Sequence, residues 1–237
     1  MVHLKKSSER GVTDIGWLKS FHSFSFGDFY NPDMVHFGSL RVLNDDYVQP
    51  GEGFPTHPHK NMEIITYVVE GELEHKDSMG TKEVIHTNEV QKMSAGRGVY
   101  HSEYNPSSEH PVHLFQTWIL PNKKGLEPYY EQIKVELKDK LNKLLKVASP
   151  DGEENTVYVS QDAHMYVSRL EKGNSMTHVL GEGRGGYLQI ISGTVVIEDT
   201  SGSVGDALLT GGPGEYVISA SEDAELILFD VAMKFTY

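Results

Sequence analysis

The chain consists largely of short segments in which apolar and polar residues alternate, and turn-forming residues interrupt these segments at close intervals. Leu40 and Val42 flank Arg41, and Phe24 and Phe26 flank Ser25. Successive side chains of a strand point to opposite faces, so this period of two is typical of β-strands. Turn signals recur along the whole chain, at Asn31-Pro32, Pro50-Gly51, Asn105-Pro106, Ser149-Pro150-Asp151-Gly152 and Gly211-Gly212-Pro213-Gly214. Many short strands with frequent turns predict an all-β protein, built as a sandwich or barrel.

One stretch has a different periodicity. From Glu136 to Val147 the apolar positions Leu137, Leu141, Leu144 and Leu145 recur at helical spacing, and Ser149-Pro150 follows as a breaker. We therefore expect a short helix here, in a connection spanning 127–152 that joins two β-rich halves.

The two halves resemble each other. Residues 68–74 (VVEGELE) and 190–196 (IISGTVV) share a strand, a glycine turn and a second strand, which suggests an internal duplication. We expect two domains in tandem, residues 1–135 and residues 136–237.

The composition restricts the partners and the compartment. Lys plus Arg number 21 and Asp plus Glu number 34, which gives a formal net charge of −13. This balance repels phosphate backbones, so we expect no direct binding of nucleic acid. The sequence contains no run of 18 apolar residues, and its first eleven residues lack the apolar core of a signal peptide, so we expect no membrane span and a cytoplasmic location. The chain has no cysteine, which suits that compartment and means that any metal is bound through nitrogen and oxygen.

Two histidines flank a proline in the segment from Gly51 to Glu63. His57 and His59 lie two residues apart, and on a strand they face the same side, so both imidazoles can reach one ion. A second pair, His101 and Glu103, repeats this spacing in a glycine-rich segment about forty residues later. Two such pairs on adjacent strands would provide three imidazoles and a carboxylate, which suit a transition metal.

The sequence pattern alone does not decide which acidic residue is the fourth metal ligand. Glu63 has the same strand parity as His57 and His59, which places it on their side, so either Glu63 or Glu103 can be the ligand. The other acid would orient a ligand or accept a proton.

These segments resemble the two motifs of the cupin superfamily. The first motif, G-x5-H-x-H-x3-E with a later glycine, is met by Gly51, His57, His59, Glu63 and Gly71. The second, G-x5-P-x-G-x2-H-x3-N, is met imperfectly, because serine replaces the proline and the histidine comes two residues late; its positions are Asn88, Ser94, Gly96, His101 and Asn105. The resemblance implies two double-stranded β-helix (jelly-roll) domains.

The departures from the second motif are similar to those of pirins, a branch of the bicupins. Further pirin-like segments are His22-Ser23-Phe24-Ser25-Phe26, Arg41-Val42-Leu43-Asn44-Asp45-Asp46, Asp77-Ser78-Met79-Gly80 and Trp118-Ile119-Leu120-Pro121. The resemblance implies that the metal ligands are His57, His59, His101 and Glu103, and that Glu63 stands behind them.

The second half departs from the motif. Only His178 lies near the expected first-motif position, and Leu180 replaces its partner. We expect this half to bind no metal, and we interpret His164 and His178 as packing or surface residues.

The resemblance implies a function as well as a fold. Bacterial pirins resemble flavonol dioxygenases of the quercetinase type, which implies cleavage of a flavonol such as quercetin by O2 with release of CO. One divalent metal ion would be the cofactor; we expect Fe(II), with Mn, Co, Ni, Cu and Zn as alternatives. Glu103 would be the catalytic base, with Glu63 as its substitute.

An alternative from another class is a metal-binding, redox-sensing pirin that regulates a protein partner. The shape of the pocket discriminates between the two, because an enzyme needs an apolar cavity above the ion. Aromatic residues near the motifs are candidates for lining such a cavity, namely Phe54, Tyr67, Tyr100, Phe115 and Trp118.

Overall fold

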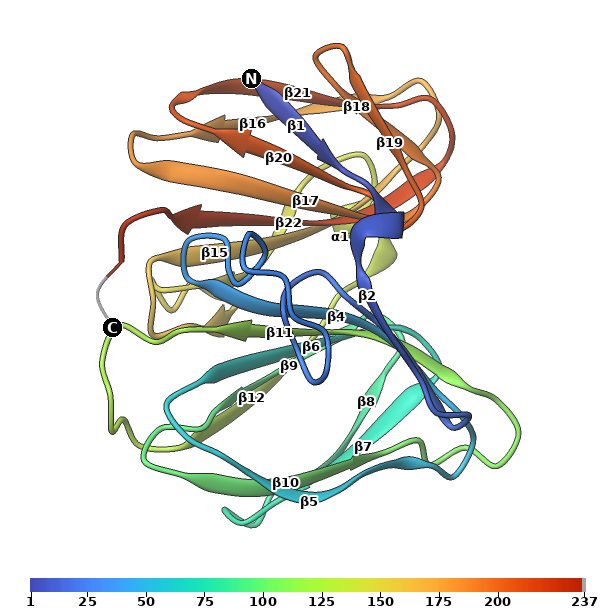
Figure 1. The fold of residues 1–237 in the computed structure, drawn as a ribbon, viewed down its shortest axis with the longest axis vertical. Helices are drawn as coiled ribbons and strands as arrows, with labels where there is room; N and C mark the ends of the chain where they lie inside the picture. Colours follow the sequence, from blue (N-terminus) through green and yellow to red (C-terminus); the bar gives the residue numbers. More distant parts are fainter. Residues whose placement is uncertain (236–237) are drawn as a thin grey trace.

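The computed structural model describes residues 1–235. Each half is a sandwich of one large and one small sheet, and the two large sheets face each other at the centre of the molecule (Figure 1). The four sheets therefore form layers in the order small, large, large, small. This arrangement confirms the predicted all-β fold.

The large sheet of the first half contains seven strands in the order β12-β9-β6-β11-β4-β3-β2. The bounds are β2 Gly11–Asp14, β3 Leu18–His22, β4 Leu40–Val48, β6 Glu63–Glu70, β9 Glu89–Ser94, β11 Val112–Ile119 and β12 Tyr129–Lys134. The small sheet has the order β5-β10-β7-β8. Its strands are β5 Gly53–His59, β7 Glu72–Asp77, β8 Lys82–His86 and β10 Val99–Tyr104.

The second half repeats this plan. Its large sheet has the order β1-β20-β17-β22-β15-β13-β14, and its small sheet has the order β16-β21-β18-β19. The large sheet consists of β1 Val2–Lys5, β13 Leu145–Ser149, β14 Val157–Tyr158, β15 Ala163–Leu170, β17 Arg184–Ser192, β20 Ala207–Gly211 and β22 Ala224–Ala232. The small sheet consists of β16 Ser175–Leu180, β18 Thr194–Ile197, β19 Thr200–Ser203 and β21 Gly214–Ala220.

The two glycine turns occupy equivalent places. Gly71 (φ 84°) joins β6 to β7, and Gly193 (φ 75°) joins β17 to β18. A Cβ atom on Gly193 would lie 2.1 Å from the carbonyl oxygen of Asp223, so both the backbone conformation and the space require glycine. The repeated turn supports the inference of a duplication.

The N-terminal strand belongs to the other half. β1 pairs antiparallel with β20, and Figure 1 shows it beside the strands of the second half. The buried Lys5 ammonium donates a hydrogen bond back to the carbonyl oxygen of Ser23 in the first half. A domain boundary at 135/136 therefore stays a proposal, and residues 2–5 pack in the sheet of the second half although they precede that boundary.

The predicted helix is much shorter than its periodicity suggested. The helix, α1, spans only Leu137–Lys140. The only other helical segment in residues 1–235 is a 3-10 turn, η1, at Ser7–Glu9. The prediction of helix from Leu141 to Val147 was wrong. Asn142 has φ 55°, which interrupts a helix, and residues from Leu145 onward form β13, which pairs with β15. None of the helices in the described part of the chain is long and apolar enough to cross a membrane.

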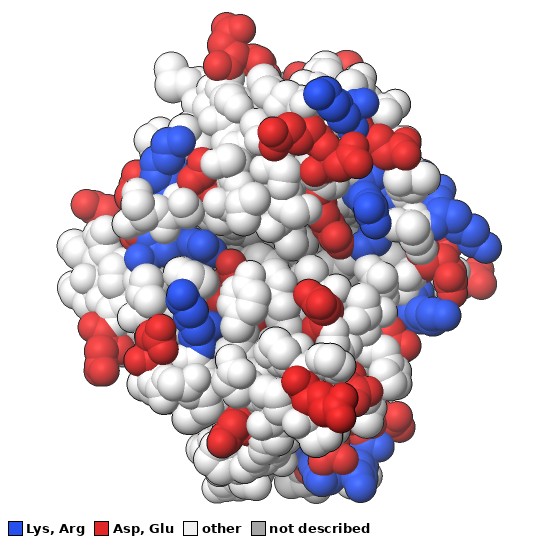
Figure 2. Space-filling view, turned by 90° about the vertical axis from the view of Figure 1, so that its right-hand side faces the viewer, with Lys and Arg blue, Asp and Glu red and all other residues white. Residues whose placement is uncertain are grey.

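The largest apolar core lies between the two large sheets. It combines Tyr67 and Phe115 of the first half with Tyr187 and Phe229 of the second. Burial of these side chains, at roughly 25 cal/mol for each Å² of apolar surface, stabilises the pairing of the halves. On the face drawn in Figure 2, lysines and arginines are scattered among the acidic side chains rather than gathered in one patch.

Candidate metal centre

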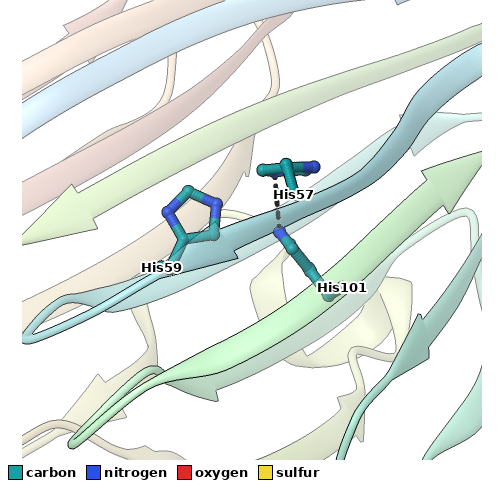
Figure 3. Close-up of side chains that lie close together, drawn as sticks. All are labelled: His57, His59 and His101. Atoms are coloured by element: carbon teal, nitrogen blue, oxygen red, sulfur yellow. Dashed lines mark hydrogen bonds between the residues drawn. The ribbon is translucent and has the colours of Figure 1, made fainter.

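Three histidines meet between two adjacent strands of the small sheet. His57 and His59 lie on β5, and His101 lies on β10, directly opposite His57 in the antiparallel register. Figure 3 shows the three rings turned toward a common space. Nε2 of His57 lies 3.0 Å from Nε2 of His101, and one nitrogen from each of the three rings lies within 4.8 Å of the others. Two nitrogens that bind one ion at about 2.1 Å and at right angles are about 3 Å apart, so this spacing fits a shared metal.

The protonation of the rings also fits a metal. Nδ1 of His57 lies 2.8 Å from the carbonyl oxygen of Pro55 and must donate to it, which leaves Nε2 bare for an ion. Burial, reinforced by the neighbouring imidazoles, lowers the pKa of His59 to about 4 and that of His101 to about 3. Both rings are therefore neutral at pH 7, the form that binds a metal.

A β-bulge in the pairing of β5 with β10 changes the position of Glu103 relative to β5. The register between β5 and β10 shifts between His101 and Glu103, so that Glu103 lies opposite Phe54. A Cβ atom on Gly53 would lie 2.2 Å from the carbonyl oxygen of Glu103, so the close approach of the strands at this bulge requires glycine.

Glu103 is buried and only half satisfied. Its Oε2 accepts a hydrogen bond of 2.8 Å from the Gln116 side chain, whereas its Oε1 has no hydrogen-bond partner in the described residues. A buried carboxylate oxygen without a partner is costly unless a cation or a ligand satisfies it. Glu103 also forms a second group of mutually close donor atoms with His101 and His75. His101 thus links a group of three imidazoles, His57, His59 and His101, to the carboxylate of Glu103, and nitrogen and oxygen donors without sulfur suit a divalent transition metal.

A cavity of about 490 Å³ opens beside these donors. Its wall includes His57, His59 and Glu103, together with the rings of Phe26, Phe54 and Trp118. The Trp118 ring meets the His59 ring edge-on at 4.9 Å between centroids, so an apolar surface adjoins the histidine group. The geometry is that of a small-molecule site with a few polar groups.

Comparison with known proteins identifies the family. Residues 3–119 match the family model of pirin, and residues 146–231 match the model of the quercetinase C-terminal cupin domain. A quercetin 2,3-dioxygenase of Escherichia coli (strain K12) is 43% identical over 231 residues, which cover 98% of this chain and 99% of that protein. The chain belongs to the pirin family. This confirms the resemblance found in the motifs and the two-cupin fold.

Solved structures agree with this assignment. The crystal structure of YhhW from Escherichia coli is 42% identical to this pirin, with a TM-score of 0.94 and full coverage of both chains. A complex of YhhW, described as a bacterial pirin, with nickel(II) has a TM-score of 0.93 and covers 98% of this chain and 99% of that one. A pirin-like protein of Caulobacter vibrioides is 37% identical over 233 residues, 98% of this chain and 100% of that protein.

Glu63 lies elsewhere in this pirin. Its carboxylate pairs with Lys92 at 2.8 Å, accepts a hydrogen bond of 2.5 Å from Ser94 and accepts one from the amide of Ser160 in the second half. The expectation that it shares the side of His57 and His59 was wrong, because the chain crosses between sheets at Asn61 (φ 51°) and strand parity is not carried across. Its suggested role as base has no support in this geometry.

Sequence reasoning missed His75 and Asp77 on β7. Both side chains are fully buried; Nδ1 of His75 lies 3.5 Å from Nδ1 of His101, and its Nε2 lies 3.0 Å from Asp77. The spacing of two residues between them was a signal, because it repeats the spacing of the other two pairs. Asp77 also accepts hydrogen bonds from the amides of Met79 and Thr81.

The aromatic candidates divide into three groups. Phe54 and Trp118 line the cavity, as expected. Tyr67 and Phe115 are instead buried in the core between the halves, and Tyr100 is 59% exposed. Phe26, which the sequence did not single out for the cavity, packs edge-on against Trp118.

The histidines of the second half have other surroundings. Nε2 of His178 lies 3.0 Å from the Asp230 carboxylate, which also accepts a hydrogen bond of 2.5 Å from Arg184. His164 is partly buried, and its Nδ1 has no hydrogen-bond partner in the described residues. Neither belongs to a group of close metal-ligating atoms within residues 1–235.

Proposed function

We propose that this pirin is a metal-dependent dioxygenase that cleaves a flavonol such as quercetin, with His57, His59, His101 and Glu103 as ligands of one divalent ion. The observation that carries the proposal is that three of these donors, His57, His59 and Glu103, line the cavity of about 490 Å³, where Phe54 and Trp118 offer apolar surface to a planar ligand. Relatives named quercetin 2,3-dioxygenase support the substrate class. The reaction consumes one flavonol and one O2 and yields the ring-opened ester and one CO.

The residues divide the work. When bound, the ion acts as a Lewis acid that lowers the pKa of the substrate hydroxyl and positions both reactants. We propose Fe(II) as the ion; the nitrogen and oxygen donors also suit Mn, Co, Ni, Cu and Zn. When Glu103 swings away from the ion, its Oε1, which has no hydrogen-bond partner in residues 1–235, accepts the hydroxyl proton, while Gln116 holds Oε2 in place. The Trp118 indole donates to Gln116 at 3.1 Å and so fixes this amide.

The alternative, a redox-sensing regulator of a protein partner, requires only a shallow ion. The cavity beside the ligands supports catalysis, because a sensor has no need of an apolar chamber of this size.

The test is aerobic turnover of quercetin by protein loaded with Fe(II) or, separately, Mn(II). Loss of flavonol absorbance and release of CO are followed, with metal content measured in parallel. We expect turnover by the wild type and its loss in His101→Ala. His86→Ala, at a histidine of β8 whose side chain is 60% exposed, is the matched control and should keep full activity. Protein with a filled site and no turnover would contradict the proposal.

A further inference from the structure

The cavity has a second polar region, on the wall that faces the candidate metal ligands. Ser20 and His22 of β3 and Asn44 and Asp46 of β4 line it. In the antiparallel register, His22 lies opposite Asn44, and Ser20 lies opposite Asp46, so the four side chains form one compact group on the large sheet. The histidine ligands lie on the small sheet, across the sandwich.

Most polar atoms of this group are satisfied within the protein. Nδ1 of His22 lies 2.9 Å from the side-chain oxygen of Asn44, and its Nε2 lies 2.8 Å from the Thr13 hydroxyl. The Ser20 hydroxyl hydrogen bonds to the Asp46 carboxyl. These contacts hold the group in place and leave little capacity for a ligand, except at Asp46.

Asp46 is the exception. It is 3% exposed, and its Oδ1 has no hydrogen-bond partner in the described residues. Among the described residues that line the cavity, only Asp46 and Glu103 carry a buried side-chain oxygen of this kind. An oxygen that is removed from water without a partner costs roughly 1–3 kcal/mol, so a ligand hydroxyl that reaches it gains affinity.

The charge state of Asp46 suits such a contact. Burial raises its pKa to about 7, and the nearby carboxylates of Asp45 and Glu103 act in the same direction, against the opposing hydrogen bond from Ser20. Near neutral pH the carboxyl can accept a proton in a hydrogen bond from a phenol or donate one to a carbonyl.

We infer that Asp46 is a specificity-determining residue that binds a second hydroxyl of the substrate, distinct from the oxygen held at His57, His59 and His101. The inference rests on the proposed function and adds the requirement that a good substrate carry a further oxygen group besides the one that binds the ion. A cavity of about 490 Å³ lies in the range that holds a ligand of two or three rings.

The test measures binding of two flavonols to the nickel-loaded protein without oxygen, so that turnover does not interfere. Quercetin carries hydroxyls on its outer rings, whereas 3-hydroxyflavone keeps only the hydroxyl and carbonyl that face the ion. The shift in flavonol absorbance reports the dissociation constant. In Asp46→Leu, which removes the polar atoms and keeps the size, we expect quercetin binding to weaken about 10-fold, or ~1.4 kcal/mol, and 3-hydroxyflavone binding to change less than twofold.

Three further variants complete the design. Asp46→Asn restores a side chain that accepts hydrogen bonds and should recover most of the affinity for quercetin. Asp199→Asn makes the same neutralising change at an exposed residue outside the cavity lining and should leave both constants unchanged. Thermal unfolding checks that Asp46→Leu is folded, and Asp46→Ala replaces it in the comparison if it is not.

The outcomes separate the two proposals. Wild-type binding of both flavonols, with no selective loss of quercetin in the Asp46 variants, would refute the role of Asp46 and leave the proposed function intact. Wild-type protein with nickel bound and no affinity for either flavonol would overturn both.

Discussion

Asp77→Asn should weaken metal binding although Asp77 is not a ligand. Asp77 can only accept a hydrogen bond from His75, so Nε2 of His75 carries the proton and its Nδ1 is bare. That bare nitrogen accepts from Nδ1 of His101, which leaves Nε2 of His101 free to face His57 and an ion. In the variant, the asparagine amide can donate to His75, and the preferred tautomers of both rings reverse. The Nε2 of His101 then carries a hydrogen where the metal should bind.

The magnitude follows from the contacts. Loss of a partner that orients a metal-bound histidine typically lowers affinity 10- to 100-fold. The His75–Asp77 contact of 3.0 Å is strong, but the His75–His101 contact of 3.5 Å lies at the outer limit of hydrogen bonding. We therefore expect the lower end of the range, about 10-fold or ~1.4 kcal/mol.

The assay is competition for Ni(II) against a chromophoric chelator at pH 7.5. Asp199→Asn, at an exposed aspartate of the second half, is the control for removal of one negative charge and should bind nickel as the wild type does. Unchanged affinity in Asp77→Asn would refute the proposed chain of hydrogen bonds. His75→Phe should give a similar 10-fold loss; complete loss of the metal would instead mean that His75 is itself a ligand, in the group that it forms with His101 and Glu103.

Two further predictions concern stability. Burial raises the pKa of Asp46 from 3.8 to about 7, so the native state binds more protons than the unfolded state between these values and loses stability as the pH rises through 7. Asp46→Asn should therefore gain at least about 1 kcal/mol relative to the wild type between pH 5 and pH 9 in urea unfolding, and an equal difference at both pH values would contradict the buried-acid argument. Lys92→Met should cost roughly 3–5 kcal/mol, because it leaves the Glu63 carboxylate buried without its ion-pair partner. The double variant with Glu63→Gln should recover part of this loss in the same assay, and a strictly additive result would mean that the pair does not interact.

The sequence predicted the histidine centre because its residues are paired within single strands. His57 and His59 share one side of β5 by the alternation of the strand, and the side chain of His101 reaches them through the register of β10. The same rule failed for Glu63, because β5 and β6 belong to different sheets and the alternation of side chains along β5 does not continue into β6. The sequence did not predict the contact of His75 and Asp77 with the histidine group, because it arises only from the pairing of β7 with β10, in which Asp77 lies opposite His101.

The limits of periodicity show in the fold as well. The leucines between 136 and 147 have helical spacing, but the pairing of β13 with β15 takes the last of them into a sheet. Nothing in the sequence of β1 indicates that it pairs with β20, about two hundred residues away, because strand partners are selected by tertiary packing. Tyr67 and Phe115 lie near the motifs in sequence, yet they point to the opposite face of the large sheet and join the core between the halves.

Asp230 in the second half and Glu103 and Asp46 in the first are buried carboxyl groups that differ in how completely the protein satisfies them. In the second half the Asp230 carboxylate has protein partners on both oxygens, His178 on one and Arg184 on the other. In the first half Glu103 and Asp46 each keep one buried oxygen without a partner among residues 1–235. Such atoms lower stability unless something else satisfies them. The second half contributes its share of the core between the large sheets and the Ser160 amide, which donates a hydrogen bond to Glu63. The presence of two such oxygens on facing walls of one cavity is therefore the feature that points to an ion at one wall and a ligand hydroxyl at the other.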